Sequence, residues 1–248
     1  MLRNHGFHLS FAVVLLLGLG ACEPPDPIRT GGGGETEYSI AVLQTEPRHP
    51  DYPGVDSRVL IRDAVVTAVD TFDEDGSGSI GNVWIAEPSG GAWSGIQLFD
   101  PVVIPARVRL SPGDIVEVSA TLDEFVLYDT AGLPIDRDGT ETELVDASVQ
   151  KIGETVPPGP TDVRVNDLAD LRTAEPWEGC LVRVTNVTLA GGYDRYGEAP
   201  TTGGIDIAKD MYEIPDARAG LALRSLTGVI TYFFGFKIMP RGPEDVEL

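Results

Sequence analysis

The sequence predicts an all-β protein in which two five-stranded Greek-key barrels follow an export signal and a flexible tether. Three observations support this prediction: short stretches alternate apolar and polar residues at period two, Gly and Pro turn signals separate them, and the whole pattern occurs twice. The 29 Gly, 19 Pro and 42% hydrophobic residues are typical of a turn-rich β protein rather than a disordered chain.

The N-terminus has the three parts of an export signal. Arg3 supplies the positive charge, an apolar run covers residues 11–19, and small residues precede Cys22. The apolar run is shorter than the roughly 20 residues that a membrane span needs. The segment LGAC at residues 19–22 resembles the lipobox of bacterial lipoproteins, which implies removal of residues 1–21 and acylation of Cys22. An ordinary secretory signal with an incidental cysteine is the alternative.

Residues 22–37 are expected to form a flexible linker after the lipidated cysteine. They contain Pro and Gly and almost no apolar residue. At about 5–6 Å × √n, this linker places the folded part roughly 20 Å from the membrane. Glu23 follows Cys22, whereas Asp in that place is the best-known signal for inner-membrane retention in some Gram-negative bacteria. The expected location is therefore the cell envelope, with a lipid anchor in the outer membrane of a Gram-negative bacterium.

The first barrel is expected over residues 38–155. After a lead-in at residues 40–44, its strands are predicted at Val59–Val69, Asn82–Glu87, Gly95–Phe99, Ile115–Leu122 and Glu143–Ser148. The fourth strand has the clearest pattern, because it follows a Pro-Gly turn and interleaves apolar residues with Glu117, Ser119 and Thr121. We expect one face of this strand to enter a core and the other to meet water.

A Pro-rich boundary at residues 156–164 precedes the second barrel, expected over residues 165–248. Its strands are predicted at Leu181–Leu189, Gly204–Ala208, Met211–Ile214, Ala222–Tyr232 and Lys237–Met239, and the best short helix at Asp167–Arg172. Residues 226–233 repeat the order of residues 118–125: apolar, hydroxyl, small, apolar, and finally Phe. This echo indicates an internal duplication.

Several of these stretches resemble a known family of domains. They are VVTAV at 65–69, WIAEPSGG at 84–91, GDIVEVS at 113–119, EF at 124–125 and TEL at 142–144, with WEGCLVRVTN at 177–186 and LTGVITYFFGFKIMPR at 226–241. Together they are similar to the OB-fold domains that accompany secreted bacterial endonucleases and occur in many acidic bacterial lipoproteins. The resemblance implies tandem OB-like barrels. A single β-sandwich is the alternative.

The composition argues against several kinds of chemistry. Lys and Arg number 18 and Asp and Glu 39, and the resulting net charge of −21 repels phosphate backbones and anionic headgroups. Nucleic acid is therefore a disfavoured partner, although it stays open as an alternative. Beyond the signal, His49 is the one histidine of the sequence, and no serine lies in a G-x-S-x-G motif. Cys180 lacks metal-ligand spacing and is expected to be a small buried residue. We therefore expect that this protein is not an enzyme.

One acidic loop carries candidate metal ligands. Asp73, Asp75 and Ser77 stand at positions 1, 3 and 5 of a segment that resembles the calcium loop of an EF-hand, and Gly78 stands at position 6. Position 12 is Trp84 instead of Glu, and the flanks are predicted to be strands. An acidic hairpin tip kept soluble by its charges is therefore the alternative, and no other cofactor is expected.

Aromatic residues provide the candidate ligand-binding positions. Trp84, Trp93, Tyr193 and Tyr196 lie on or beside predicted strands, and OB-folds commonly stack bases or sugars on such residues. Core packing is the alternative for these residues. The expected function is a non-catalytic binding module of the cell envelope whose partner is an envelope protein or a glycan. The alternative is an OB-fold accessory module that binds an oligonucleotide or oligosaccharide, with calcium as a candidate ligand.

Overall fold

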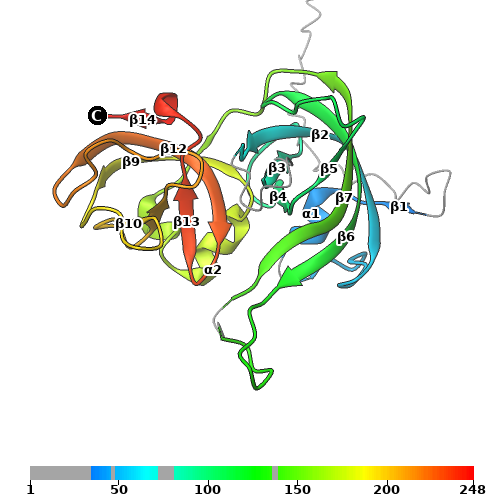
Figure 1. Ribbon diagram of the computed structural model, residues 1–248, viewed down its shortest axis with the longest axis horizontal. Helices are drawn as coiled ribbons and strands as arrows, with labels where there is room; N and C mark the ends of the chain where they lie inside the picture. Colours follow the sequence, from blue (N-terminus) through cyan, green and yellow to red (C-terminus); the bar gives the residue numbers. More distant parts are fainter. Residues whose placement is uncertain (1–34, 46–47, 72–80, 136–138) are drawn as a thin grey trace, which may run out of the picture.

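The computed structural model describes residues 35–45, 48–71, 81–135 and 139–248. These residues form two β-sheets that lie side by side and carry only short helices (Figure 1). No helix within the described ranges is long and apolar enough to cross a membrane. The all-β class predicted from the sequence is confirmed.

The first sheet closes into a barrel. It comprises β1 (Thr36–Glu37), β2 (Arg58–Val69), β3 (Val83–Ala86), β4 (Gly95–Leu98), β5 (Val102–Ile104), β6 (Asp114–Phe125) and β7 (Glu141–Glu154). The barrel order is β2-β3-β4-β7-β6, and β6 pairs again with β2. These neighbours are antiparallel except β4 and β7, which are parallel. The short strands β1 and β5 add to β2 and β7 in parallel.

The second sheet repeats this order of pairing. It comprises β8 (Thr161–Asp162), β9 (Leu181–Thr188), β10 (Glu198–Pro200), β11 (Asp206–Ala208), β12 (Ala222–Tyr232), β13 (Phe236–Met239) and β14 (Val246–Glu247). The order is β10-β11-β13-β12-β9-β8, with β11 parallel to β13 and β14 paired with β12. A bridge between Leu189 and Thr201 connects the end of β9 to the end of β10.

The helices are short, and side chains cap the two α-helices among them. They are α1 (Ile40–Gln44), the 3₁₀ helices η1 (Val165–Asp167), η2 (Glu175–Trp177) and η3 (Pro243–Asp245), and α2 (Leu171–Ala174). Ser39 Oγ accepts a hydrogen bond from Val42 N at the start of α1 (3.3 Å), and Ile40 and Leu43 enter the core of the first barrel. The expected lead-in of the first barrel is therefore a helix.

Some expected elements differ from those observed. The segment Met211–Ile214 is not a strand, because Ile214 fills the second core from an irregular segment and its N–H donates to Tyr193 Oη (3.1 Å). The strand β10 was not predicted, whereas the strand expected at Gly204–Ala208 corresponds to β11. The helix expected at Asp167–Arg172 is divided into η1 and α2, because Asp170 adopts an extended backbone and caps α2. The last strand of the first barrel also continues to Glu154.

β6 has the alternation that its sequence predicts. Its inward residues Val116, Val118, Ala120 and Leu122 are 0% exposed, whereas the residues between them are half-buried on the outer face. The pattern is confirmed because successive side chains of a strand point to opposite faces.

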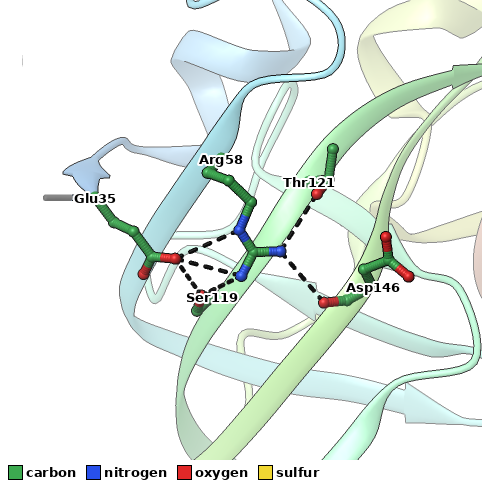
Figure 2. Close-up of polar contacts among 5 residues, drawn as sticks. All are labelled: Glu35, Arg58, Ser119, Thr121 and Asp146. Carbon is green, nitrogen blue, oxygen red and sulfur yellow. Dashed lines mark hydrogen bonds and ion pairs between the residues drawn. The ribbon is translucent and has the colours of Figure 1, made fainter. Parts of the chain in front are cut away.

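Arg58 fastens the first described residues to the barrel, as Figure 2 shows. Its guanidinium donates to Glu35 Oε1 (3.3 and 3.4 Å) and to the hydroxyls of Ser119 (2.6 Å) and Thr121 (3.2 Å). It also donates to the backbone oxygen of Asp146 (3.4 Å). The described chain is thus attached to the outer face of β2, β6 and β7 from Glu35 onward, within the segment expected to be a free linker.

Candidate functional site

Four of the predicted site residues lie outside the described part of the chain. They are the lipidation residue Cys22 and the calcium-loop residues Asp73, Asp75 and Ser77. Within the described ranges, no group of three or more His, Cys, Asp and Glu residues is placed to hold a metal ion. Lipidation and calcium binding stay predictions from the sequence.

The two predicted tryptophans lie where the two sheets meet. Trp84 is 2% exposed and packs against residues of the second sheet. Trp93 is half-buried, and its backbone N–H donates to the carbonyl of Pro176 (2.6 Å). In this arrangement the ring of Trp84 is covered and cannot stack on a ligand.

The two predicted tyrosines lie on the connection between β9 and β10. Tyr193 packs against the second core, and its hydroxyl accepts the hydrogen bond from Ile214 N. Tyr196 is 67% exposed, and Arg195 Cζ lies 4.5 Å from its ring centroid. The structure therefore does not join the four predicted aromatics into one stacking surface.

Several strands are buried on both faces where the two sheets meet. Every residue of β3 and β4 is buried, as are the first four residues of β7 and all of β13. One face of β3 and β4 lines the core of the first barrel, and the other meets the second sheet. We call this contact the junction. Its apolar cluster consists of Ala68, Trp84, Leu181, Ala208, Val229 and Met239.

The backbones of the two sheets come into contact at one point of the junction. A Cβ built on Gly95 would lie 2.2 Å from the carbonyl oxygen of Gly179, so both sheets need glycine there. Nearby, Arg241 Nη1 donates to Thr67 O (3.0 Å). As expected, Cys180 is buried, and its thiol donates to Gly91 O across the junction (3.2 Å).

Buried glutamates make further polar contacts across the junction. Glu141 Oε1, on β7, accepts hydrogen bonds from Thr231 Oγ1 (2.5 Å) and Tyr232 N (3.3 Å) on β12. In the opposite direction, Glu178 Oε1 accepts from Thr142 N on β7 (2.8 Å). Within the described residues, these carboxyl groups are among the polar groups that link the two sheets.

A third glutamate, Glu143, lies beside Glu141 on β7. Its Oε2 accepts from Gln97 Nε2 (3.1 Å) on β4. Burial raises the pKa of Glu141 from 4.5 to about 7. Burial, followed by the charge of Glu141, raises the pKa of Glu143 to about 7 as well. Burial, followed by the charges of Glu141 and Glu175, raises the pKa of Glu178 well above its usual value.

A second feature is an exposed aromatic surface, which we call the tip patch. It consists of Phe125, Tyr128, Leu133 and Ile135 on β6 and the β6–β7 connection, and Phe233 and Phe234 on the β12–β13 turn. The rings of Phe125 and Phe233 stack with centroids 6.3 Å apart, and Phe233 and Phe234 meet edge to face at 4.8 Å. In the aromatic run at residues 232–236, Phe234 (φ = 55°) and Gly235 (φ = 123°) form a turn that leaves Phe233 and Phe234 exposed.

Four of the six members of the tip patch are strongly exposed. Tyr128, Leu133, Ile135 and Phe234 are each at least half exposed, at 61%, 50%, 53% and 53%. The connection that carries the first three is held by Asp129 Oδ1, which accepts from the backbone N–H groups of residues 131 and 133. Clusters of exposed apolar side chains are typical of interaction sites.

The third feature is a polar groove of about 820 Å³ on the outer face of β9 and β12. Three arginines line it, and each forms an ion pair inside the groove: Arg164 with Asp167, Arg183 with Asp162, and Arg224 with Glu247. Because these charges pair with one another, the groove has no net charge to attract an ionic ligand.

Comparison with known proteins adds no family and no relative. No protein-family model and no curated protein matches the chain. The function of this chain is therefore inferred from its own sequence and surfaces.

Proposed function

We propose that this protein is a non-catalytic binding module of the cell envelope, built from tandem OB-like barrels and held at the outer membrane by the lipid on Cys22. Support for OB-like barrels comes from the cyclic order β2-β3-β4-β7-β6, which the second sheet repeats as β9-β10-β11-β13-β12. The OB-fold is a five-stranded Greek-key barrel of this kind.

The tip patch is the observation that carries the binding function. In OB-folds the loop between the fourth and fifth strands takes part in ligand binding, and the corresponding β6–β7 connection carries half of the tip patch. Exposed Tyr128, Ile135 and Phe234 provide large apolar side chains of the type that dominate protein interfaces.

The chemistry of the tip patch favours a protein partner. None of its six members carries a positive charge, and the chain has a net charge of −21. Nucleic acid and anionic lipid headgroups are therefore repelled, whereas an envelope protein with an apolar surface fits. An oligonucleotide or oligosaccharide partner is the alternative, with calcium at Asp73, Asp75 and Ser77 as its candidate ligand. In OB-folds such partners use the second and third strands, here β3 and β4, and in this structure the second sheet covers that face.

The test uses the full-length chain in native membranes, with a photo-reactive amino acid placed at Phe234 or, as a control, at Phe99. Phe99 is a matched control because it is also half exposed (51%) but lies outside the tip patch. We expect a discrete cross-linked protein from position 234 only. The purified partner should bind the Phe234→Ser variant roughly tenfold more weakly or worse, and the Phe99→Ser variant unchanged.

Two outcomes contradict the proposal. Equal binding by the Phe234→Ser and Phe99→Ser variants would exclude the tip patch as the interface. Saturable, salt-sensitive binding of a labelled single-stranded oligonucleotide, measured by fluorescence anisotropy, would favour the alternative module.

A further inference from the structure

We propose that the junction is a carboxyl latch: it keeps the β3–β4 face of the first barrel covered while Glu141 and Glu178 are protonated, and it releases that face when they ionise. The latch requires no partner at the tip patch, although the stacked rings of Phe125 and Phe233 belong to opposite sheets.

The two glutamates occupy the positions that a latch requires. Glu141 belongs to the first barrel and accepts from Thr231 and Tyr232 of the second sheet. Glu178 belongs to the second half and accepts from Thr142 of the first barrel. Both side chains are almost fully buried, at 6% and 3% exposure. Inside the closed junction, the ionised form of either carboxyl group would therefore lack the hydration that stabilises it in water.

Orphaned polar atoms make the closed junction easier to open. Glu178 Oε2 and Trp84 Nε1 are buried and have no hydrogen-bond partner among the described residues. An unsatisfied buried polar atom lowers stability, because water would satisfy it in the open state. Both atoms would gain water if the second sheet moved away from β3 and β4. These unsatisfied atoms thus destabilise the closed junction even when neither glutamate is ionised.

The surroundings of the latch are predominantly acidic. Glu178 faces Glu141 on β7, Glu175 on η2 and Glu124 on β6. Glu141 faces Lys237 on β13, and Glu143 faces Glu141 and Asp123 on β6. Two of these neighbours have opposite charges beside them: Lys237 Nζ pairs with Glu198 (3.1 Å), and Glu124 forms an ion pair with Arg48.

Among these described groups, each new ionisation adds negative charge beside other carboxylates in a dry site. Burial is the main cause of the raised pKa of both Glu141 and Glu178, and at Glu178 the charges of neighbouring glutamates raise it further. A hydrated glutamate ionises near its usual pKa, so the open state releases protons that the closed state retains. The equilibrium constant for opening therefore rises with pH, by up to about tenfold per pH unit for each proton released.

Opening would change what the first barrel can bind. The β3–β4 face carries Trp84 and Gln97, which are 2% and 5% exposed in the closed state. If the barrel is OB-like, as proposed above, this is the face on which such barrels bind ligands. That consequence rests on the proposed topology, whereas the opening itself does not.

Cys180 provides a native probe of the latch. It is 2% exposed, and its thiol donates to Gly91 on the opposite side of the junction. In full-length protein in detergent micelles, the rate of maleimide labelling is divided by the rate for the unfolded chain at the same pH, which removes the effect of thiol ionisation. The Cys180→Ala variant gives the background.

We expect the protection of Cys180 to fall tenfold or more between about pH 6 and about pH 8. Glu141→Gln with Glu178→Gln should make this fall much smaller, because the amide imitates the neutral acid and Glu143 is then the remaining buried glutamate of the junction among those described above. Glu213→Gln is the matched control, an exposed glutamate paired with Lys209 away from the latch, and should titrate like the wild type. Each single glutamine variant is measured as well, in case the double variant does not fold.

A second measurement separates opening from local loosening. The chain has three tryptophans, so the pair of variants Trp93→Phe and Trp177→Phe leaves Trp84 as the sole emitter. Its emission should shift to the red, with greater acrylamide quenching, over the same pH range as the Cys180 labelling. The latch is refuted if Cys180 protection does not change with pH, if the glutamine variants keep the wild-type dependence, or if Trp84 stays protected while Cys180 reacts.

Discussion

Replacing Gly95 by alanine should force the two sheets apart. The new Cβ would lie 2.2 Å from Gly179 O, 2.3 Å from Gly179 C and 2.5 Å from Cys180 N. These are backbone atoms, so no side-chain rotation relieves the clash. Gly179 cannot absorb it by a change of its own conformation either, because it has φ = +70° and lies against Gly95. The contact can be relieved only if the sheets separate or a strand shifts.

The expected cost is that of overpacking, about 1–3 kcal/mol, and the contact between backbones favours the upper end. For a chain of this size, about 1 kcal/mol lowers Tm by roughly 2–4 °C, so Tm should fall by up to about 10 °C. Scanning calorimetry measures this fall. Trp84 quenching should rise at every pH, because the junction no longer closes fully.

Gly159→Ala is the matched control. A methyl group at Gly159 would meet no atom of the described residues within 4 Å, and the backbone there is not left-handed. This variant should leave Tm and quenching unchanged. If Gly95→Ala also had the Tm and quenching of the wild type, the close approach of Gly95 and Gly179 would be wrong, and with it the junction.

Three further predictions concern acidity, the anchor and the tether. Glu143 has its pKa raised from 4.5 to about 7, so the folded state binds more protons than the unfolded one between these values, and the free energy of unfolding should fall as pH rises through this window. Urea unfolding at about pH 5 and about pH 8 should show a loss of up to about 3 kcal/mol for this group, and Glu143→Gln should reduce it. Cys22→Ser should release the protein from membranes, and unchanged fractionation would rule out the lipoprotein assignment. Arg58→Ala should cost at most about 1 kcal/mol, because its ion pair with Glu35 is partly exposed. It should nevertheless speed hydrogen exchange at Thr36 and Glu37, and unchanged exchange would show that Arg58 does not hold β1.

The sequence predicted those strands whose apolar pattern depends only on neighbouring residues. The alternation of β6 could be recognised because a half-buried strand places every second side chain in the core. The unbroken apolar run Val-Trp-Ile-Ala of β3 was a sign of burial on both faces, but sequence alone could not say what covers the second face. The short strand β10 was missed because Glu198–Pro200 has no such pattern.

The tip patch was only partly foreseeable. The aromatic run at residues 232–236 is evident in the sequence, and if it were a strand, alternate members would point into the core. Tyr232 and Phe236 are indeed buried, at 4% and 7% exposure, but the turn between them exposes Phe233 and Phe234. Two successive residues with positive φ, Phe234 and Gly235, form this turn, and Phe rarely adopts that conformation.

By itself the sequence determined the β class and the strand faces, because these depend on local periodicity. The export signal and the lipid anchor stay predictions from short contiguous segments. The junction was decided by tertiary structure alone. Glu141 and Glu178 are two acids among 39, and their sequence neighbours do not distinguish them from the others. They differ because the packing of one sheet on another removes their water, and desolvation depends on which surfaces meet in space rather than on the order of residues along the chain.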